Sequence, residues 1–304
     1  MKMKNTGSKP TVKTSEWQKN KTLYLMVAPF FLLFTIFTIV PVLFAIIISF
    51  TDYNVIQTPN FVGLSNYISL FLNDPLFLTA IKNTFIMAVI IGPCGYLLSF
   101  LMAWMLCELN DKLRIVLTVI LYGPSISGNV FMIWTLIFSS DSTGFANSWL
   151  LSSGIINEPI LWLQDTKYMM LIIIIVQLWM SFGVGFLSFI SGLQGVDKAQ
   201  LEAGMVDGIT NRWQELWYIV LPSMKPVLLF GAVMAITGAF SISGSALTGF
   251  PSTGYATHSI VDHLTDYGTT KMELGYASAL AVILFVVTIG SNKLIQKFLR
   301  KVGT

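Results

Sequence analysis

The chain has 304 residues, of which 54% are apolar and only 11% are charged. Soluble domains carry about 25% charged residues, so this chain lacks the charge needed to cover a water-facing surface. The composition excludes a disordered chain and argues against a soluble globular enzyme. It predicts an integral membrane protein.

Long charge-free runs predict the membrane spans. The 18 basic and 15 acidic residues fall in short clusters, and the runs between them reach the length of about 20 apolar residues that a span needs. We expect an all-α integral membrane protein with six transmembrane helices in residues 22–304. The approximate spans are 23–50, 84–106, 115–138, 168–190, 226–249 and 274–295.

The first 21 residues form a basic tail, which we expect to be disordered and cytoplasmic. The apolar run that follows is too long for the core of a signal peptide, and no small-x-small cleavage site closes it. We therefore interpret it as a retained first span. Pro29 and Pro41 lie inside this span and are expected to kink it, which neighbouring helices of a bundle tolerate.

The distribution of Lys and Arg predicts the orientation. With six spans, 15 of the 18 basic residues lie on one side, and only Lys82, Lys167 and Lys271 lie on the other. Because cytoplasmic loops are enriched in Lys and Arg, we place both termini in the cytoplasm. The predicted topology is that of a membrane protein with several passes.

Polar residues inside the spans are candidates for a translocation path, since each needs a partner within the bundle. Gln177 and Ser181 lie one helical turn apart in the fourth span. Thr237, Ser241 and Ser245 repeat every four residues in the fifth. Amide and hydroxyl groups suit a solute with hydroxyl groups, but ordinary helix–helix hydrogen bonding remains an alternative for both sets.

Residues 197–222 form an unusual segment between the fourth and fifth spans. Asp197 is a good N-cap for a short helix, and Asp207-Gly208 is a turn signal that ends it. Four apolar residues then repeat at helical spacing and predict an amphipathic stripe, namely Trp213, Leu216, Trp217 and Val220. Such a segment is either a docking element on the cytoplasmic face or a plain connecting loop.

The same segment resembles the EAA motif of ABC importer permeases, which reads Glu-Ala-Ala, three residues, Gly, about nine residues, and Ile-x-Leu-Pro. The matching residues here are Glu202, Ala203, Gly204, Asp207, Gly208, Ile219, Leu221 and Pro222. Two departures are visible: Gly204 stands where the motif has its second Ala, and the interval after Gly208 is one residue longer.

Several other segments are similar to sugar-type permeases of the maltose and multiple-sugar group. They include residues 61–67, 83–84, 122–124, 144–147 and 275–279, together with Trp134. In that group, the positions matching Gln177, Met180, Ser181 and Val184 line the sugar site. Thr237 and Ser241 fall near a second such cluster, and Trp134 and Asn129 are weaker candidates.

The resemblance implies a bundle like that of type I ABC importers with a cytoplasmic coupling loop, located in a bacterial plasma membrane. It implies a second permease subunit, two cytoplasmic ATPase subunits that hold ATP and Mg²⁺, and an extracytoplasmic sugar-binding protein. Glu202, Ala203, Gly204, Asp207 and Gly208 would couple the bundle to the ATPases. This chain would bind no cofactor, have no catalytic residue and drive transport by alternating access.

Other polar groups carry less information. Cys94 and Cys107 are expected to be small buried hydrophobes. His258 and His263 lie beside Asp262 and Asp266 in an outer loop, and we expect surface polar residues there, not a metal site. The sequence has no nucleotide-binding fingerprint and no nucleophile elbow.

Two observations bear on the competing functions. No ionisable residue lies well inside a predicted span, which argues against a proton-coupled transporter. Nothing indicates a nucleic-acid partner. A permease for another small polar solute, a membrane scaffold that docks a cytoplasmic partner without transporting, and a channel or transporter acting alone stay open as alternatives.

Overall fold

The structure is a computed structural model that describes residues 20–128 and 130–301. The predicted basic tail thus lies mostly outside the described residues. The chain divides into two compact units, one up to Ile47 and one from Ile48 onwards. Within the described part the only β-type pairing is an isolated bridge between Thr51 and Phe61, so the all-α prediction is confirmed.

The first unit contains the first predicted span. Its helix runs as α2 (Lys21–Phe34), a π-helical turn η1 (Thr35–Ile39) and α3 (Val40–Ile48). Pro41 cannot donate to the carbonyl of Phe37, and its ring crowds that carbonyl. The wider π turn directly before Val40 relieves this crowding, as local π adjustments do in membrane helices. Pro29 is accommodated inside α2.

The second unit is a helical bundle. Its larger helices are α5 (Pro75–Cys107), α6 (Asp111–Ile126), α9 (Thr166–Met180), α10 (Val184–Gln194), α14 (Lys225–Phe240) and α17 (Leu274–Lys301). Its shorter elements are α4 (Ser65–Leu72), α7 (Val130–Ile137), α8 (Phe145–Ser152), α11 (Lys198–Val206), α12 (Arg212–Glu215), η2 (Leu216–Val220), α13 (Leu221–Ser223), α15 (Ser245–Thr248), η3 (Thr253–Tyr255), α16 (Ile260–Thr265) and η4 (Asp266–Thr270).

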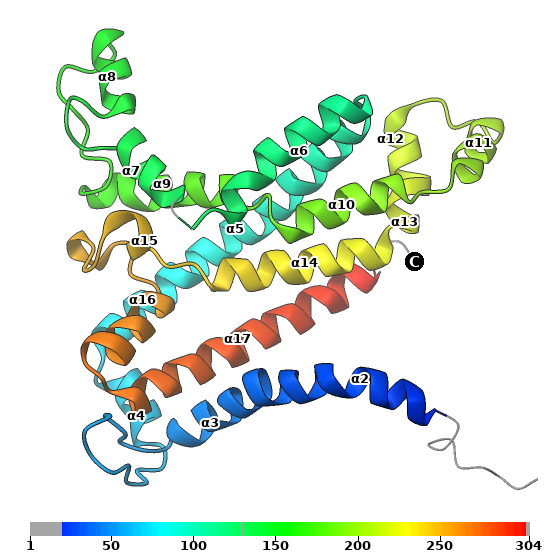
Figure 1. The fold of residues 1–304 in the computed structure, drawn as a ribbon. Helices are drawn as coiled ribbons and strands as arrows, with labels where there is room; N and C mark the ends of the chain where they lie inside the picture. Colours follow the sequence, from blue (N-terminus) through cyan, green and yellow to red (C-terminus); the bar gives the residue numbers. More distant parts are fainter. Residues whose placement is uncertain (1–19, 129, 302–304) are drawn as a thin grey trace, which may run out of the picture. The chain divides into compact units, whose positions relative to one another are not determined.

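The bundle is assembled around α5 and α14. Helix α14 packs against α5, α10 and α17, and Figure 1 shows α10, α14 and α17 running side by side in green, yellow and red. An aromatic core at the end that we expect to face the cytoplasm, called the inner end below, joins α5 to α10 and to the segment after α11, and it contains Phe100, Phe186 and Phe189. A separate core at the opposite end, called the outer end below, joins α4, α5, α16 and α17.

The helices support the predicted spans by length and composition. Within the described residues four helical runs are long and apolar enough to cross a membrane: Lys21–Ile48, Pro75–Cys107, Thr166–Gln194 and Leu274–Lys297. Two bent pairs also qualify, α6 with α7 and Arg212–Ser223 with α14. Counting each bent pair as one span gives the six that the charge-free runs predict.

The third expected span is broken between Ile126 and Val130, and the fourth is interrupted as described below. Two helix ends also differ from the expected bounds by nine residues. Helix α5 begins at Pro75, nine residues before position 84, because Asp74 caps it by accepting from the N–H groups of Leu76 and Phe77. Helix α14 ends at Phe240, nine residues before position 249. Charge-free runs could not indicate either end, since α5 contains Lys82 and the chain after Phe240 stays uncharged.

Candidate translocation site and coupling segment

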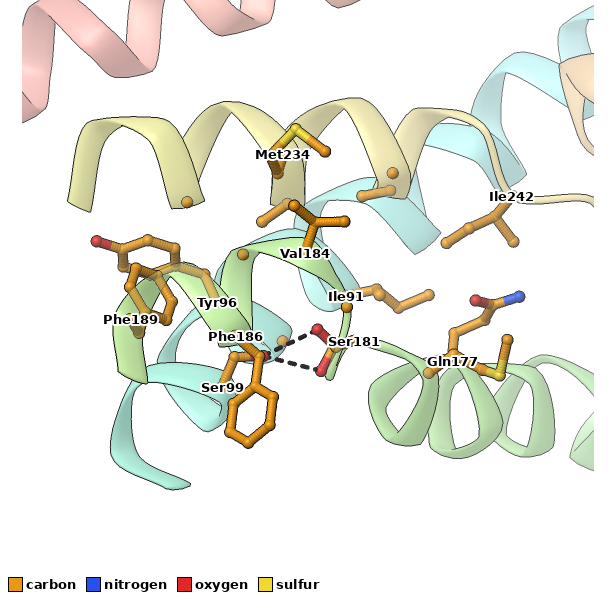
Figure 2. Close-up of a pocket in the computed structure, with 18 residues that line it drawn as sticks. Ile91, Tyr96, Ser99, Gln177, Ser181, Val184, Phe186, Phe189, Met234 and Ile242 are labelled. Carbon is orange, nitrogen blue, oxygen red and sulfur yellow. Dashed lines mark hydrogen bonds between the residues drawn. The ribbon is translucent and has the colours of Figure 1, made fainter. Parts of the chain in front are cut away.

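A cavity of about 210 Å³ lies where α5, the α9–α10 junction and α14 meet. Gln177, Met180, Ser181 and Val184 all line it, so the structure brings together the four residues that the sequence assigned to one site. Figure 2 shows Gln177, Ser181 and Val184 around the junction, with Met234 of α14 on one side. The volume is below the range of about 300–1,000 Å³ that is typical of ligand pockets.

The fourth predicted span is broken at this cavity. Helix α9 ends at Met180 and α10 begins at Val184, so the span, which as Thr166–Gln194 is long and apolar enough to cross a membrane, is interrupted by three residues. Ser181 donates to the carbonyl of Leu178 at 2.6 Å, and its own carbonyl accepts from the Ser99 hydroxyl at 3.0 Å. The two serines thereby satisfy backbone and side-chain groups that the break releases.

The break places hydrogen-bond donors at the cavity wall. The first N–H groups of a helix have no acceptor within it, and Val184, Gly185 and Phe186 of the first turn of α10 line the cavity. Gln177 is half-buried, and its amide makes no hydrogen bond within the described part of the chain. The wall thus offers both donors and an acceptor to a ligand.

A glycine allows α5 to approach this break. A Cβ atom on Gly95 would lie 2.8 Å from the Cβ of Ser181, closer than side chains tolerate. Small residues permit such close packing between membrane helices. Gly95 therefore positions Ser99, one turn further along α5, within reach of the Ser181 carbonyl.

The polar residues of the fifth span do not join this site. Thr237 and Ser241 are exposed and lie outside the cavity lining; Ser241 donates to the Thr237 carbonyl, and Asn292 of α17 donates to the Thr237 hydroxyl. Ser245 lies on α15, after the end of α14, so the expected stripe of three is wrong. The roles of Thr237 and Ser241 stay predictions.

The two weaker candidates of the third span are Trp134 and Asn129, and Trp134 does not join the cavity lining either. The Trp134 ring packs edge-on against Trp179 and stacks with Phe138, each at a centroid distance of 5.9 Å. These contacts account for Trp134 as a packing residue between α7 and α9. Asn129 lies outside the described residues.

The coupling segment begins as predicted. Asp197 accepts from the N–H of Ala199 at 2.9 Å and caps α11, so its role as N-cap is confirmed. At the other end, Gly208 has φ +96° and donates to Met205, while Ile209 donates to Gly204. This pair of bonds is the Schellman motif, which needs a left-handed residue at this position.

Gly204 explains one departure from the EAA motif. It is the buried residue of α11, and a Cβ atom there would lie 2.4 Å from Cδ1 of Ile219 and 3.1 Å from Cδ1 of Ile209. The missing methyl group leaves room for these two isoleucines. The glycine therefore seats α11 on the π-helical turn η2 that follows it.

The other residues of α11 face outward. Glu202, Ala203 and Asp207 are exposed, and the neighbouring Met205 and Val206 are 62% and 88% exposed. Exposed apolar side chains next to carboxylates are available to a protein partner. The five predicted coupling residues thus divide into three exposed side chains and two glycines that shape the helix end and its seat.

The amphipathic stripe after the turn is divided between two surroundings. Leu216 and Val220 are buried in the inner aromatic core, whereas Trp213 and Trp217 are about two-thirds exposed. Trp213 packs on Trp104 of α5 at a centroid distance of 5.0 Å. The predicted stripe therefore has two residues packed inside the protein and two that stay exposed, and Trp213, Leu216 and Trp217 line one groove.

The outer loop of His258 and His263 is the largest departure from expectation. Both histidines are almost fully buried, which contradicts their assignment as surface residues. Asp262 beside them accepts hydrogen bonds from the hydroxyls of Ser243, Ser245 and Ser259 and from backbone N–H groups. No group of three metal-ligating side chains was found in the described residues.

This buried network is anchored on α5 by long-range contacts. The Asn83 amide donates to the carbonyls of Tyr255 and His258, and the Thr84 hydroxyl accepts from the N–H of Ile260. Burial alone would raise the pKa of Asp262, but the serine hydroxyls and backbone N–H groups hold that pKa below its ordinary value. A charged carboxylate is thus stabilised inside the outer segment.

Comparison with known proteins places these features in a family. The arabinooligosaccharides transport system permease protein AraP of Bacillus subtilis (strain 168) is 31% identical over 282 residues, covering 89% of this chain and 86% of that protein. The lactose transport system permease protein LacF of Rhizobium radiobacter is 31% identical over 224 residues and 72% of each chain.

A solved structure shares the fold. A chain of a bacterial ABC transporter involved in the import of the acidic polysaccharide alginate superposes with a TM-score of 0.77 and 22% identity, covering 95% of this chain and 98% of that one. Residues 95–303 match the model of the binding-protein-dependent transport system inner membrane component. The chain, a helical membrane protein with a type I importer fold, therefore belongs to this family of inner membrane transport components.

Proposed function

We propose that the chain is the subunit that carries a sugar or oligosaccharide across the plasma membrane in an ABC importer. The observation that carries this proposal is the chemistry of the cavity. Its described lining contains the Gln177 amide, serine hydroxyls and the donor groups of the α10 N-terminus, but no ionised side chain. Such a wall suits an uncharged solute with many hydroxyl groups, and the named substrates of AraP and LacF are of this kind.

The driving force would come from partner subunits. We infer that two cytoplasmic ATPases bind ATP and Mg²⁺ and contact α11. A second permease subunit and an extracytoplasmic binding protein would complete the importer. The exposed Met205 and Val206 beside Glu202 support a protein contact at α11. A solved alginate transporter in complex with its substrate-bound periplasmic protein is an example of the last partnership.

The transport cycle follows from the site. Closure of the ATPase dimer would pull α11, and its seat on η2 passes the movement to the inner aromatic core. That core contains Phe186 and Phe189 of α10, the helix that also forms the cavity wall. We infer that this route opens the cavity outward, and that ATP hydrolysis on the partner subunits resets it.

Reconstitution tests the function. The full chain is purified with its partner permease, ATPases and binding protein, and uptake of labelled oligosaccharides into proteoliposomes is measured with ATP inside. ATP-dependent uptake of a sugar is expected. Uptake of a different polar solute would identify another substrate class, and ATP-independent flux would indicate a channel. Assembly without any transport would assign the chain to a scaffold.

Cysteine labelling tests the orientation. We expect both termini in the cytoplasm and the loop that contains Asn157 outside, because the basic residues gather at the other loops. A membrane-impermeant thiol reagent should label Asn157→Cys from outside and Arg212→Cys only after the membrane is opened. Labelling of position 157 from the cytoplasm alone would overturn the six-span topology.

A further inference from the structure

The two histidines of the chain form a buried hydrogen-bonded row with Asp74. Nε2 of His263 lies 2.8 Å from Oδ2 of Asp74, and Nδ1 of His263 lies 3.0 Å from Nε2 of His258. The His258 and His263 side chains are 2% and 1% exposed. At the end of the row, Nδ1 of His258 is buried and has no hydrogen-bond partner among the residues that the structure describes.

The row allows only one arrangement of protons when both rings are neutral. The Asp74 carboxylate is an acceptor, so Nε2 of His263 carries the hydrogen and its Nδ1 is an acceptor. Nε2 of His258 must then donate to that Nδ1, which leaves a lone pair on Nδ1 of His258. The unpartnered atom is therefore the one that can take up a proton.

Uptake of a proton would move charge along the row. When a proton binds Nδ1 of His258, the N–H bond at its Nε2 breaks and a new N–H bond forms at Nδ1 of His263. Two protons then reside on His263, and the positive charge lies beside the Asp74 carboxylate. Because the two rings interact directly, the pair takes up one proton and resists a second.

Asp74 joins three helices at this point. Its Oδ1 accepts from the N–H groups of Leu76 and Phe77 and so caps α5, while its Oδ2 accepts from His263 of α16 and from the Tyr276 hydroxyl of α17. The outer segment, residues 241–273, is thus tied to the start of α5 through His263. A change of charge on the row acts directly on this tie.

Other charged groups surround the row but are already paired. Asp262 of α16 is saturated by serine hydroxyls and backbone N–H groups, and Asp266 of η4 forms an ion pair with Lys271 at 3.1 Å. Tyr267 of η4 packs on the His263 ring. Asp74 is therefore the carboxylate that directly stabilises a positive charge on His263.

Burial lowers the proton affinity of the two histidines while the outer segment is closed. It lowers the pKa of His263, although the hydrogen bond and charge of Asp74 act in the opposite direction. Burial, followed by the charge of His263, lowers the pKa of His258. Exposed imidazole has a pKa of about 6.5, so a released segment binds the proton more readily. The closed segment therefore has its full stability above about pH 6.5 and loses stability as the pH drops below that value.

We propose that the Asp74–His263–His258 row is an acid-sensitive latch that holds the outer segment on α5 at neutral pH and loosens it when the extracytoplasmic side becomes acidic. The latch goes beyond the proposed transport function and takes only its outward position from the proposed topology. It would make the outer face of the importer responsive to the pH of its surroundings.

Thiol accessibility tests the latch in the full chain, held in lipid nanodiscs. Cys94 and Cys107 are first replaced by alanine. Thr257→Cys then serves as a probe inside the closed segment, because Thr257 is fully buried, and Thr269→Cys serves as the exposed control. Dividing the first labelling rate by the second removes the intrinsic pH dependence of the thiol reaction.

The expected result is a several-fold rise in this ratio between pH 7.5 and pH 5.5. Each unit by which closure depresses the pKa corresponds to about a tenfold change in the ratio of open to closed segments. The double variant His258→Gln/His263→Gln cannot take up the proton and should give a ratio that does not change with pH. A flat ratio in the parent chain, or an equal rise in the double variant, overturns the latch.

A second variant covers the case in which the glutamines loosen the segment at pH 7.5. Asp74→Asn keeps a good helix cap but removes the negative charge that offsets a proton on His263. Its ratio should rise further on acidification than that of the parent, and an equal or smaller rise overturns the proposal. Because no sugar, ATP or partner enters this assay, its failure leaves the proposed transport function untouched.

Discussion

The inner and outer segments that interrupt the bundle are built in opposite ways. The coupling segment, residues 197–222, buries Leu216 and Val220, but its helix α11 is held only by end caps and one glycine contact and leaves carboxylates and apolar side chains exposed. The outer segment, residues 241–273, buries six of its polar side chains. These are Ser252, Thr257, His258, Ser259, Asp262 and His263.

The difference indicates how each segment gains its shape. The exposed side chains on α11 form few contacts within this chain. We therefore expect a bound partner protein to supply the contacts that hold this helix in place. The outer segment satisfies most of its buried polar groups through Asp262 and the row ending at Asp74, so its shape is held mainly by contacts within this chain. Substitutions should therefore destabilise the outer segment but uncouple the inner one.

Asp262→Ala should have the largest effect. It leaves several buried donors of Ser243, Ser245, Ser259 and Gly244 without an acceptor, at about 1–3 kcal/mol for each unsatisfied group. We expect a total loss of about 3 kcal/mol or more, measured as a lower melting temperature of the purified chain. Glu273→Ala is the control, because Glu273 is an exposed carboxylate of the same segment and a surface substitution of this kind changes stability by about 0.5 kcal/mol or less. If both variants lost the same amount of stability, the buried network around Asp262 would contribute no more than a surface carboxylate.

Gly208→Val should uncouple the chain without unfolding it. A β-branched residue at φ +96° strains the turn by about 1–3 kcal/mol and tilts α11. The chain should reach the membrane and pair with its partner permease, but hold the ATPases weakly and lose their stimulation by loaded binding protein. Copurification and ATPase assays in proteoliposomes measure this.

The conservative variant sharpens the same test. Gly208→Asn should keep most of the stimulation, because asparagine visits left-handed backbone conformations readily. Full stimulation in the valine variant would show that residues 197–222 are an ordinary connector. The transport proposal would then lose its main physical support at the inner face.

Gln177→Ala should weaken transport several-fold without affecting assembly. A lost hydrogen bond between neutral groups costs about 0.5–1.5 kcal/mol, and the effect should appear in the uptake kinetics. Gln194→Ala, which removes an exposed amide outside the cavity lining, should leave uptake unchanged. Unaltered kinetics of the Gln177 variant with every substrate would assign its amide to packing.

Gly204→Ala should have the smallest effect. The added methyl group meets Cδ1 of Ile219, the far end of a flexible side chain that can move. The gain in helix propensity, about 1 kcal/mol for Gly to Ala, offsets this crowding, so stimulated ATPase activity should stay within about twofold of the parent. A larger loss that Ile219→Val restores would show that the seat of α11 on η2 controls coupling.

Features with a local signature were predictable from the sequence. Charge-free runs indicated the spans, Asp197 and Gly208 indicated both ends of α11, and the spacing of Gln177 and Ser181 brought two cavity residues together. Each of these depends on residues only a few positions apart. The caps in particular depend on one side chain and one backbone angle.

Features that depend on distant residues were missed. His258 and His263 are buried because Asp74 and Asn83, more than 170 positions away, accept and donate to this loop. The break at Ser181 needs the Ser99 hydroxyl from another helix. A serine followed two residues later by a glycine, as in Ser181-Phe182-Gly183, is the one local signal that could have indicated it.

Helix α5 connects the outer segment, the cavity and the coupling segment. It has 33 residues and thus spans about 50 Å, compared with a hydrocarbon core of about 30 Å. Asp74 caps its outer end, Gly95 lies at the cavity, and Trp104 contacts the coupling segment. As a rigid lever pivoting at Gly95, it has arms of about 30 Å outward and 14 Å inward. A 10° swing that moves the inner arm by about 2 Å would displace the outer cap by about 5 Å.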